Sequence, residues 1–438
     1  MDKITAKQEI EKLVEKFKHD EKRFKSAHYN ETEVRREFID PFFTALGWNV
    51  ADSKEIKHED SAYITVEPGK RAKKHPDYGF YLDGTLRFYV EAKKPAVKLY
   101  QEQEPALQIR RYGWSSNLPI GVLTDFEELI VYNCQIRPNG SDSAAVGRVR
   151  SYKYTEYLEK FDEIFELLSK ESVRKGSLFA LVDKQRGTDT VDIAFLREIE
   201  NWRELLAKNI ALRNPTLTSR DLNQVVQNTI DRIIFLRIAE DRGIEQYGTI
   251  EALLNGRNLY HDLKRIFQSA HDKYNSGLFE FSDPDIGDQL AMSIVIDDKP
   301  LQEIIGNLYW PKSPYIFNVM PVDILGQVYE RFLGKVIRLD NGTAVIEDRP
   351  EIRKAGGVYY TPVYVVNYIV KHAIEKLVDG KTPDEVAKLR ILDPACGSGS
   401  FLLGAYHFLI RWHLDYYLAH PKHAAKKLRK HGPLCHNR

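Results

Sequence analysis

The spacing of apolar residues changes along this chain, and these changes constrain the fold more than any other feature of the sequence. Up to about residue 150, short alternating runs predict strands near 61–66, 78–82, 86–92, 119–124 and 128–133. Helical spacing in the same region predicts helices over 31–46 and 101–116. With 438 residues, the chain is too long for one ordinary core, so we expect an α/β protein with several domains.

A helical pattern follows from about 155 to 340, and its clearest stretch is "TSRDLNQVVQNTIDRIIFLRIAEDRGI". Thr218 and Asp221 resemble a capping box at its start, and Gly243 can close it. The stretch "VDILGQVYERFLG" predicts another helix. Residues 338–357 are charged and rich in turn formers, which predicts a loop or linker. Three arginines in the first stretch are expected on a solvated face or in ion pairs with neighbouring acids: Arg232, Arg237 and Arg242.

Composition excludes several classes of protein. The net charge of +1 does not mark the whole molecule as a polyanion binder. Cys134, Cys396 and Cys435 are too few and too scattered for a disulfide framework or a zinc cluster, which suits a reducing, cytoplasmic location. The charged start has no apolar core of a signal peptide, and no apolar run reaches membrane-spanning length.

The stretch "HPDYGFYLDGTLRFYVEAKKP", residues 75–95, brings two acids and a lysine together. Asp83-Gly84 is a hairpin turn signal, and pairing about it sets Asp77 opposite Val90 or Glu91. Because side chains alternate along a strand, Glu91 and Lys93 share one face while Ala92 points the other way. The three charged side chains are therefore expected at one end of a two-stranded unit.

Such a group suits phosphodiester hydrolysis. Asp77, Glu91 and the Ala92 carbonyl offer hard oxygen ligands, which favour Mg²⁺. The metal would polarise a phosphate and lower the pKa of a bound water, while Lys93 would hold that water or neutralise developing charge. The basic run "GKRAKKH" upstream is expected to contact neighbouring phosphates. The alternative is a set of charges on a solvated hairpin; the apolar neighbours Phe88 and Val90 favour the metal site.

The order "NETEVRREFIDPFFTALGW … HPDYGFY … FYVEAKKP … QIRRYGW … LPIGVLTDFEELIVYN" resembles the PD-(D/E)xK nuclease domain of type I restriction motor subunits and type IIG restriction enzymes, over residues 28–135. The resemblance implies a mixed-sheet nuclease fold in which Asp77 and Glu91 are metal ligands and Lys93 is the catalytic lysine. It also implies the remaining roles: Glu31 as the accessory helix acid, with Gln108 and Tyr112 as a QxxxY element near the DNA. Glu33 could replace Glu31, and the sequence leaves this choice open.

A second pattern lies beyond residue 357. A helix is predicted over about 364–377, then a short strand "RILD" that ends in Asp393, and a long helix from about Ser400. Gly397 and Gly399 permit a tight turn in front of the positive end of that helix. The residues alone predict the start of a Rossmann-like parallel sheet with a small-molecule site at the turn, or a plain structural turn.

The string "DPACGSGSFL" resembles motif I of the amino-group (N6-adenine) DNA methyltransferases, and "GGVYYTPVYVVNYIV", 356–370, resembles their other cofactor segment. The resemblance implies an S-adenosylmethionine site lined by the turn residues Asp393, Pro394, Ala395, Gly397 and Gly399. Thr361, between Tyr360 and Pro362, would close over the cofactor. The later Asn-Pro-Pro-Tyr or Asp-Pro-Pro-Tyr motif is absent, and the chain stops about 40 residues after motif I. We therefore expect an incomplete methyltransferase domain, from a longer or truncated enzyme, that does not methylate DNA.

Together these patterns predict a nuclease domain over 1–155, a helical connector over 156–345 and the N-terminal part of a methyltransferase domain over 346–438. The expected activity is Mg²⁺-dependent cleavage of double-stranded DNA by a type II site-specific deoxyribonuclease of a type IIG restriction-modification system. One active site cuts one strand, so double-strand cleavage needs self-association or a second visit. The alternative is an inert fragment, or a DNA-binding or regulatory remnant that cuts nothing.

Overall fold

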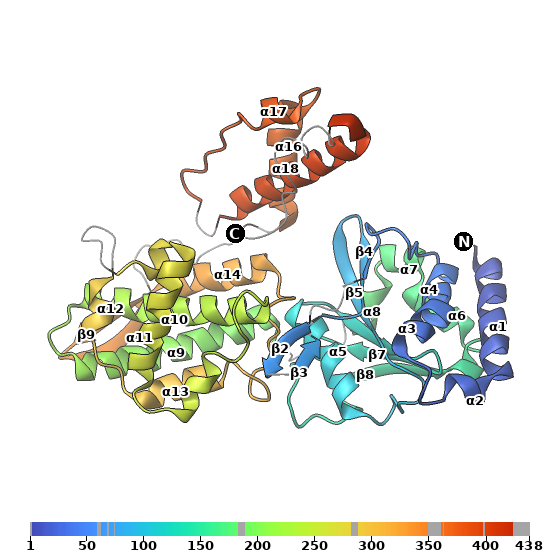
Figure 1. Cartoon of the computed structure of the whole chain (residues 1–438), viewed down its shortest axis with the longest axis horizontal. Coiled ribbons are helices and arrows are strands. Elements are labelled where there is room, and N and C mark those ends of the chain that lie inside the picture. The colour runs from blue at the N-terminus through green and yellow to red at the C-terminus, as the bar shows by residue number, and fades with distance from the viewer. Residues whose placement is uncertain are drawn as a thin grey trace. The chain divides into compact units, whose positions relative to one another are not determined.

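The computed structural model describes residues 2–58, 63–67, 70–73, 75–182, 189–281, 288–348, 361, 363–396 and 399–423. The chain divides into two compact units (Figure 1). The first unit holds Met1–Pro321 and Ile337–Glu347, and the second holds Val322–Val336 and Asp348–Arg438. Most of the predicted nuclease and connector segments therefore share one unit.

A six-stranded mixed sheet forms the centre of the N-terminal segment, in the order β1-β4-β5-β6-β7-β8. Its strands are β1 Ile56–His58, β4 Tyr78–Leu82, β5 Thr85–Ala92, β6 Ile120–Thr124, β7 Glu128–Asn133 and β8 Arg148–Lys153. All neighbours are antiparallel except β5 and β6, which are parallel and joined by helix α5, Gln103–Ser115. The four predicted strands of this sheet and the helix after β5 are confirmed.

In the first 153 residues, three strands were not predicted from the sequence. β2, Tyr63–Glu67, was predicted, but its antiparallel partner β3, Lys70–Lys73, was not. The edge strands β1 and β8 each bury one residue, Ile56 in β1 and Tyr152 in β8. One buried side chain produces no apolar alternation, so strands of this kind leave no readable pattern.

Each face of the sheet has its own apolar core. One core joins β4, β5, β6 and β7 to helices of the N-terminal segment: α1 Lys3–His19, α2 Glu21–Phe24, α6 Phe161–Leu168, α7 Lys170–Arg174 and α8 Ser177–Val182 (Figure 1). Phe88, Val90 and Ala92 of β5 belong to it. The other core lies under α5 and contains Tyr89 and Tyr112. Because side chains alternate along β5, Glu91 lies on the same face of the strand as Tyr89.

The helix predicted over 31–46 is formed with a local change. It consists of α3 Glu31–Val34, the π-helix η1 Arg35–Ile39 and α4 Asp40–Ala45. Gly47, with φ of 90°, follows its end. Pro41 has no N–H, and its ring would clash with the carbonyl of residue 37 in an ordinary α-helix, which accounts for the wider turn just before it.

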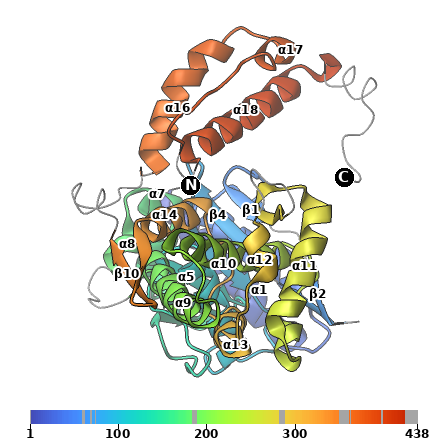
Figure 2. The same cartoon turned by 90° about the vertical axis from the view of Figure 1, so that its left-hand side faces the viewer.

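The connector segment is helical, as predicted. Its elements are α9 Val191–Arg213, α10 Ser219–Asp241, α11 Leu259–Tyr274, α12 Gln289–Ser293 and α13 Asp298–Gly306, with short 3₁₀ helices at Tyr154–Glu156, Glu251–Asn255 and Gly277–Phe279. α9 and α10 lie side by side (Figure 2). The capping box of Thr218 and Asp221 is confirmed.

Of the three arginines considered in the sequence, the two within α10 are buried in ion pairs with acids, as expected. The Arg232 guanidinium lies 2.9 Å from Asp288, and the Arg237 guanidinium lies 2.8 Å from Asp241. Arg242 is exposed.

The prediction of a loop over 338–357 is wrong for its first part. Residues 335–348 form a hairpin of β9 Lys335–Asp340 and β10 Thr343–Asp348. Asn341 and Gly342 have φ of 49° and 81°, which are the positive values that a tight hairpin turn needs. The turn formers that indicated a loop are therefore the two central residues of this hairpin. Residues 349–357 lie outside the described part of the chain.

The second unit contains α14 Val322–Leu333, α16 Val363–Val378, α17 Pro383–Val386 and α18 Ser400–Ala419, so its three predicted helices are confirmed. α16 and α18 pack together through Val366, Val370 and Ala405 (Figure 2). The predicted strand "RILD" is not formed: residues 390–393 are irregular, and Leu392 is 84% exposed. A parallel strand is stable only when neighbouring strands pair with it, and no other strand of this sheet lies in the described residues around it. Among the described helices, none has the length and apolarity to cross a membrane.

Candidate active site

The β4–β5 hairpin places two acids side by side. Asp83 and Gly84 both have positive φ, 52° and 77°, as a two-residue turn between strands requires. Tyr78 pairs with Val90, so continuing the register by one residue sets Asp77 level with Glu91. The sequence left this position open between Val90 and Glu91, and the structure decides it.

The two acids Asp77 and Glu91 are buried, and Lys93 contacts Glu91. Asp77 is 4% exposed and Glu91 is fully buried. Lys93 donates a hydrogen bond from Nζ to Glu91 Oε1 at 2.6 Å, and Asp77 Oδ2 accepts one from the Ala92 N–H at 2.8 Å. These side chains are therefore not the charges of a solvated hairpin. Burying carboxylates costs free energy unless cations or hydrogen bonds compensate them, which is what Lys93 and the Ala92 N–H do.

The charge on Lys93 is stabilised by several acids. Burial by itself would lower the pKa of Lys93, but the charge and hydrogen bond of Glu91, together with other acids, outweigh burial and raise it. Glu31 and Asp77 raise this pKa further through their negative charges. Glu31, on α3, thus lies within electrostatic range of the lysine. These acids therefore favour the protonated form of Lys93 at neutral pH.

The structure distinguishes the two acids of α3. Glu33 takes part in a capping box, in which its carboxylate accepts from the Asn30 N–H at 2.8 Å and its own N–H donates to Asn30 Oδ1 at 3.0 Å. Its carboxylate is thus occupied at the start of the helix. Glu31 makes no such cap and instead acts on Lys93. Glu31 is the better candidate for the accessory acid.

Replacing each acid separately tests this assignment. We expect Glu31→Ala to slow DNA nicking about tenfold with little loss of stability, because the residue orients charges at the site. We expect Glu33→Ala to cost about 1 kcal/mol of unfolding free energy and to leave nicking nearly unchanged, because it removes a helix cap. Plasmid nicking and thermal unfolding of both variants would measure this; the opposite pattern would exchange the two roles.

Gln108 and Tyr112 come from α5, on the opposite side of β5 from Phe88 and Val90. Gln108 Nε2 lies 3.4 Å from the Tyr112 hydroxyl. Burial raises the pKa of Tyr112, and the negative charges of Glu91 and Asp77 raise it further. The structure thus brings Tyr112 near both carboxylates.

Arg35 and His58 are close to the site although the sequence assigned them no role. Arg35 Nη1 lies 3.4 Å from Asp77 Oδ1, its Nε donates to the Tyr78 hydroxyl at 3.1 Å, and its Nη2 lies 3.3 Å from His58 Nδ1. The spacing of Arg35 four residues after Glu31 was a readable signal, because such residues share a helix face. No local pattern pointed to His58, which reaches Arg35 from β1.

The donor set of the hairpin suits a hard divalent cation. Asp77 and Glu91 offer carboxylate oxygens from neighbouring positions of the hairpin, and Mg²⁺ prefers oxygen ligands. No group of three or more His, Cys, Asp or Glu side chains in the described ranges is arranged to hold a metal. Main-chain oxygen, water and phosphate would have to complete the coordination, which is usual for Mg²⁺. Of the basic run, Lys74 lies outside the described residues, and the side chains of 70–73 are not described.

The described residues cover only part of the predicted cofactor turn. Asp393 Oδ1 accepts a hydrogen bond from the Ala395 N–H at 3.1 Å, and Pro394 and Ala395 are exposed. Gly399, with φ of 78°, caps the start of α18. Thr361 is irregular in structure, while Gly397, Tyr360 and Pro362 lie outside the described residues. Without the strand before Asp393, the described residues do not build a cofactor pocket by themselves.

Two family models match the chain. The type I restriction enzyme R protein N terminus family matches residues 28–140, which contain the hairpin site. The N-6 DNA methylase family matches residues 321–428, which contain the glycine turn. One chain thus matches a restriction-enzyme family over one segment and a DNA-methylase family over another.

Curated relatives have the same combination. The chain is 35% identical over 437 residues to the Escherichia coli type II restriction enzyme and methyltransferase RM.Eco57I, covering 98% of this chain and 43% of that protein. It is 23% identical over 286 residues to the putative type II restriction enzyme and methyltransferase RM.MjaORFECS2P of Methanocaldococcus jannaschii, covering 46% of this chain and 23% of that protein. The chain thus spans less than half the length of these relatives. The predicted resemblance to restriction-modification fusion proteins is confirmed.

Among solved structures, the chain matches the type IIG restriction endonuclease BpuSI at 14% identity. The match covers 86% of this chain and 37% of that one, with a TM-score of 0.24. A score this low carries no argument about the fold.

Proposed function

We propose that this chain is a Mg²⁺-dependent DNA endonuclease of a type IIG restriction-modification system, with a PD-(D/E)xK nuclease domain over residues 1–155. The observation that carries the proposal is the buried pair of Asp77 and Glu91 on adjacent segments of the hairpin, with Lys93 Nζ 2.6 Å from Glu91. The match of residues 28–140 to a restriction-enzyme family supports it.

In this proposal each side chain has a separate task. Asp77 and Glu91, with the Ala92 carbonyl, would hold Mg²⁺, which supplies a polarised phosphate and a more acidic water. Lys93, kept protonated by its acidic neighbours, stabilises negative charge that develops on the phosphate oxygens. Glu31 orients Lys93, and Gln108 with Tyr112 faces the DNA.

For the rest of the chain we propose a helical connector over 156–345 and a methyltransferase segment over 346–438. Its match to the N-6 DNA methylase family supports S-adenosylmethionine as ligand, with contacts from Thr361 and from the turn Asp393–Gly399.

A plasmid nicking assay tests the proposed function. The chain is incubated with supercoiled DNA and Mg²⁺, with and without S-adenosylmethionine, and a parallel sample contains EDTA. We expect open-circular DNA in the presence of Mg²⁺ and none with EDTA, because the two carboxylates need the cation to bind the phosphate. A folded chain that never nicks under these conditions would instead support the DNA-binding or regulatory alternative.

A further inference from the structure

The segment Ser313–Val319, which we name the strap, links the helical connector to α5 of the sheet domain. Ser115, at the end of α5, accepts a hydrogen bond from the Ile316 N–H at 3.0 Å. Ser116 donates to the Val319 carbonyl at 2.9 Å. The side chain of Ile316 belongs to the same apolar core as Tyr112. The strap thus contacts α5 through its backbone and through this core.

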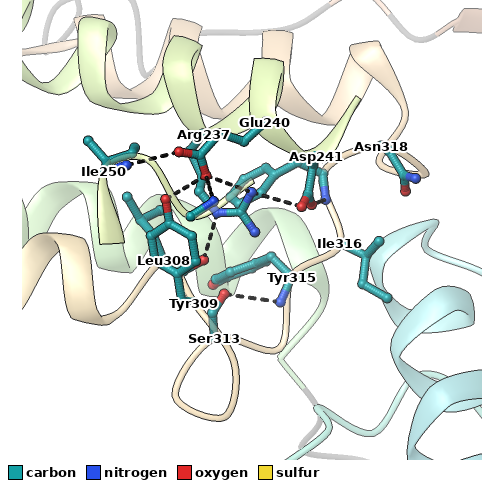
Figure 3. A network of polar contacts seen from close by, with 12 residues as sticks. Arg237, Glu240, Asp241, Ile250, Leu308, Tyr309, Ser313, Tyr315, Ile316 and Asn318 are labelled. Carbon is teal, nitrogen blue, oxygen red and sulfur yellow. Dashed lines mark hydrogen bonds and ion pairs between the residues drawn. The ribbon is translucent and has the colours of Figure 1, made fainter. Parts of the chain in front are cut away.

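On its other side the strap is held by α10. Asp241 Oδ2 accepts a hydrogen bond from the Phe317 N–H at 2.8 Å, while Asp241 Oδ1 accepts from Arg237 at 2.8 Å. Arg237 also donates from Nε to the Leu308 carbonyl at 3.0 Å, and Figure 3 shows this network. Asp241 and Arg237 are both almost fully buried. The two oxygens of one carboxylate therefore join α10 to the strap.

The strap also reaches the segment that carries the first acid of the site. Asn318 Nδ2 lies 3.1 Å from His75 Nε2, and His75 is two residues before Asp77. One short segment thus contacts both the helix that carries Tyr112 and the strand entry that carries Asp77. A shift of the strap relative to the sheet would displace two parts of the site together.

We propose that the strap is a positioning element of the nuclease site, and that Asp241 is the positioning residue that holds it. Asp241 and Arg237 fix the strap, and the strap keeps Tyr112 and Asp77 in register with Glu91. The inference rests on the proposed nuclease function. A displacement of α10 would therefore change the cutting rate, because α10 holds the strap and the strap contacts the segments that carry Tyr112 and Asp77.

A pair of matched substitutions tests the proposal. Asp241→Asn replaces one of the two acceptor oxygens by an NH2 donor, so either Arg237 or the Phe317 N–H then faces a donor in place of its acceptor. Asp288→Asn is the control, because Asp288 is equally buried, also accepts through both oxygens and pairs with Arg232 of the same helix. Arg232 donates hydrogen bonds to Asp288 and to the Leu278 carbonyl, both within the connector.

Two measurements on variants of the whole chain test the positioning role of Asp241. In plasmid nicking, we expect Asp241→Asn to lower kcat at least about tenfold with an unchanged KM for DNA, and Asp288→Asn to stay near wild type, because small displacements of catalytic groups slow the chemical step. In hydrogen exchange, we expect faster exchange of peptides from α5 and residues 75–82 in Asp241→Asn alone. Equal effects of the two variants on both readings would overturn the proposal.

The two readings also separate this inference from the proposed function. If the wild-type chain does not nick DNA, the nuclease function fails, and hydrogen exchange still decides whether Asp241 holds α5 and the Asp77 segment. If Asp241→Asn does not fold, Ser115→Ala takes its place, because it removes the acceptor of the Ile316 N–H from the α5 side. Unchanged kcat and unchanged exchange in Ser115→Ala would contradict the positioning role.

Discussion

Lys93→Ala is expected to lower Mg²⁺-dependent plasmid nicking at least about hundredfold, the scale on which removing one group that stabilises transition-state charge acts. Lys93 is the cation hydrogen-bonded to Glu91, and Glu31 and Asp77 add to its stabilisation. Alanine removes this positive charge while leaving both carboxylates in place. The rate would be measured from the conversion of supercoiled to open-circular plasmid at saturating Mg²⁺.

Lys94→Ala is the matched control, because Lys94 is the next residue and is only partly buried. Both variants should show the circular dichroism of the wild type, and only Lys93→Ala should lose nicking. Wild-type nicking by Lys93→Ala would contradict the proposed role of the lysine.

The pKa of Lys93 also predicts a pH dependence of stability. Burial alone would lower this pKa, and Glu91 raises it above the ordinary value of 10.5. A raised folded-state pKa means that the stability from the pair is fully present below pH 10.5 and is lost as the pH rises through the folded value. Nicking should therefore show no loss from Lys93 deprotonation around neutral pH.

Much of the hairpin site could be predicted because its geometry is local. Asp83-Gly84 determines the turn, the turn sets the register, and alternation along β5 then places Glu91 and Lys93 on one face. Asn341-Gly342 indicates a hairpin turn as clearly as Asp83-Gly84 does, but the charged residues around it led to the prediction of a loop. The two cases differ in their flanking strands, because β5 has buried residues in succession and β10 buries only Ala344.

Features that depend on distant parts of the chain were not predictable. Arg35, His58 and Asp77 meet from a helix, an edge strand and the start of β4, and no spacing in the sequence indicates this contact. The strap is a similar case, because Phe317 and Asp241 are far apart in sequence. The prediction of a strand at 390–393 was wrong for the opposite reason, because its local pattern was suitable. A parallel strand depends on neighbouring strands, and the described residues do not provide them.

Asp77→Asn is expected to reduce nicking about hundredfold at low Mg²⁺ and to raise the Mg²⁺ concentration needed for half-maximal rate, because a neutral amide is a weaker ligand for a hard cation than a carboxylate. The fold should persist, since an amide oxygen can still accept from the Ala92 N–H that now bonds Asp77. The measurement is the nicking rate as a function of Mg²⁺ concentration.

Asp40→Asn provides the control, because Asp40 accepts from the Tyr78 hydroxyl at 2.7 Å and an amide oxygen can do the same. Its Mg²⁺ dependence should match that of the wild type. Comparing Asp77→Asn with Lys93→Ala then separates a metal ligand from a charge that acts on the phosphate. Loss of a ligand moves the Mg²⁺ midpoint, whereas loss of the lysine lowers the maximal rate at every Mg²⁺ concentration. If both variants lower only the maximal rate, Asp77 orients the hairpin through Ala92 and does not bind the metal.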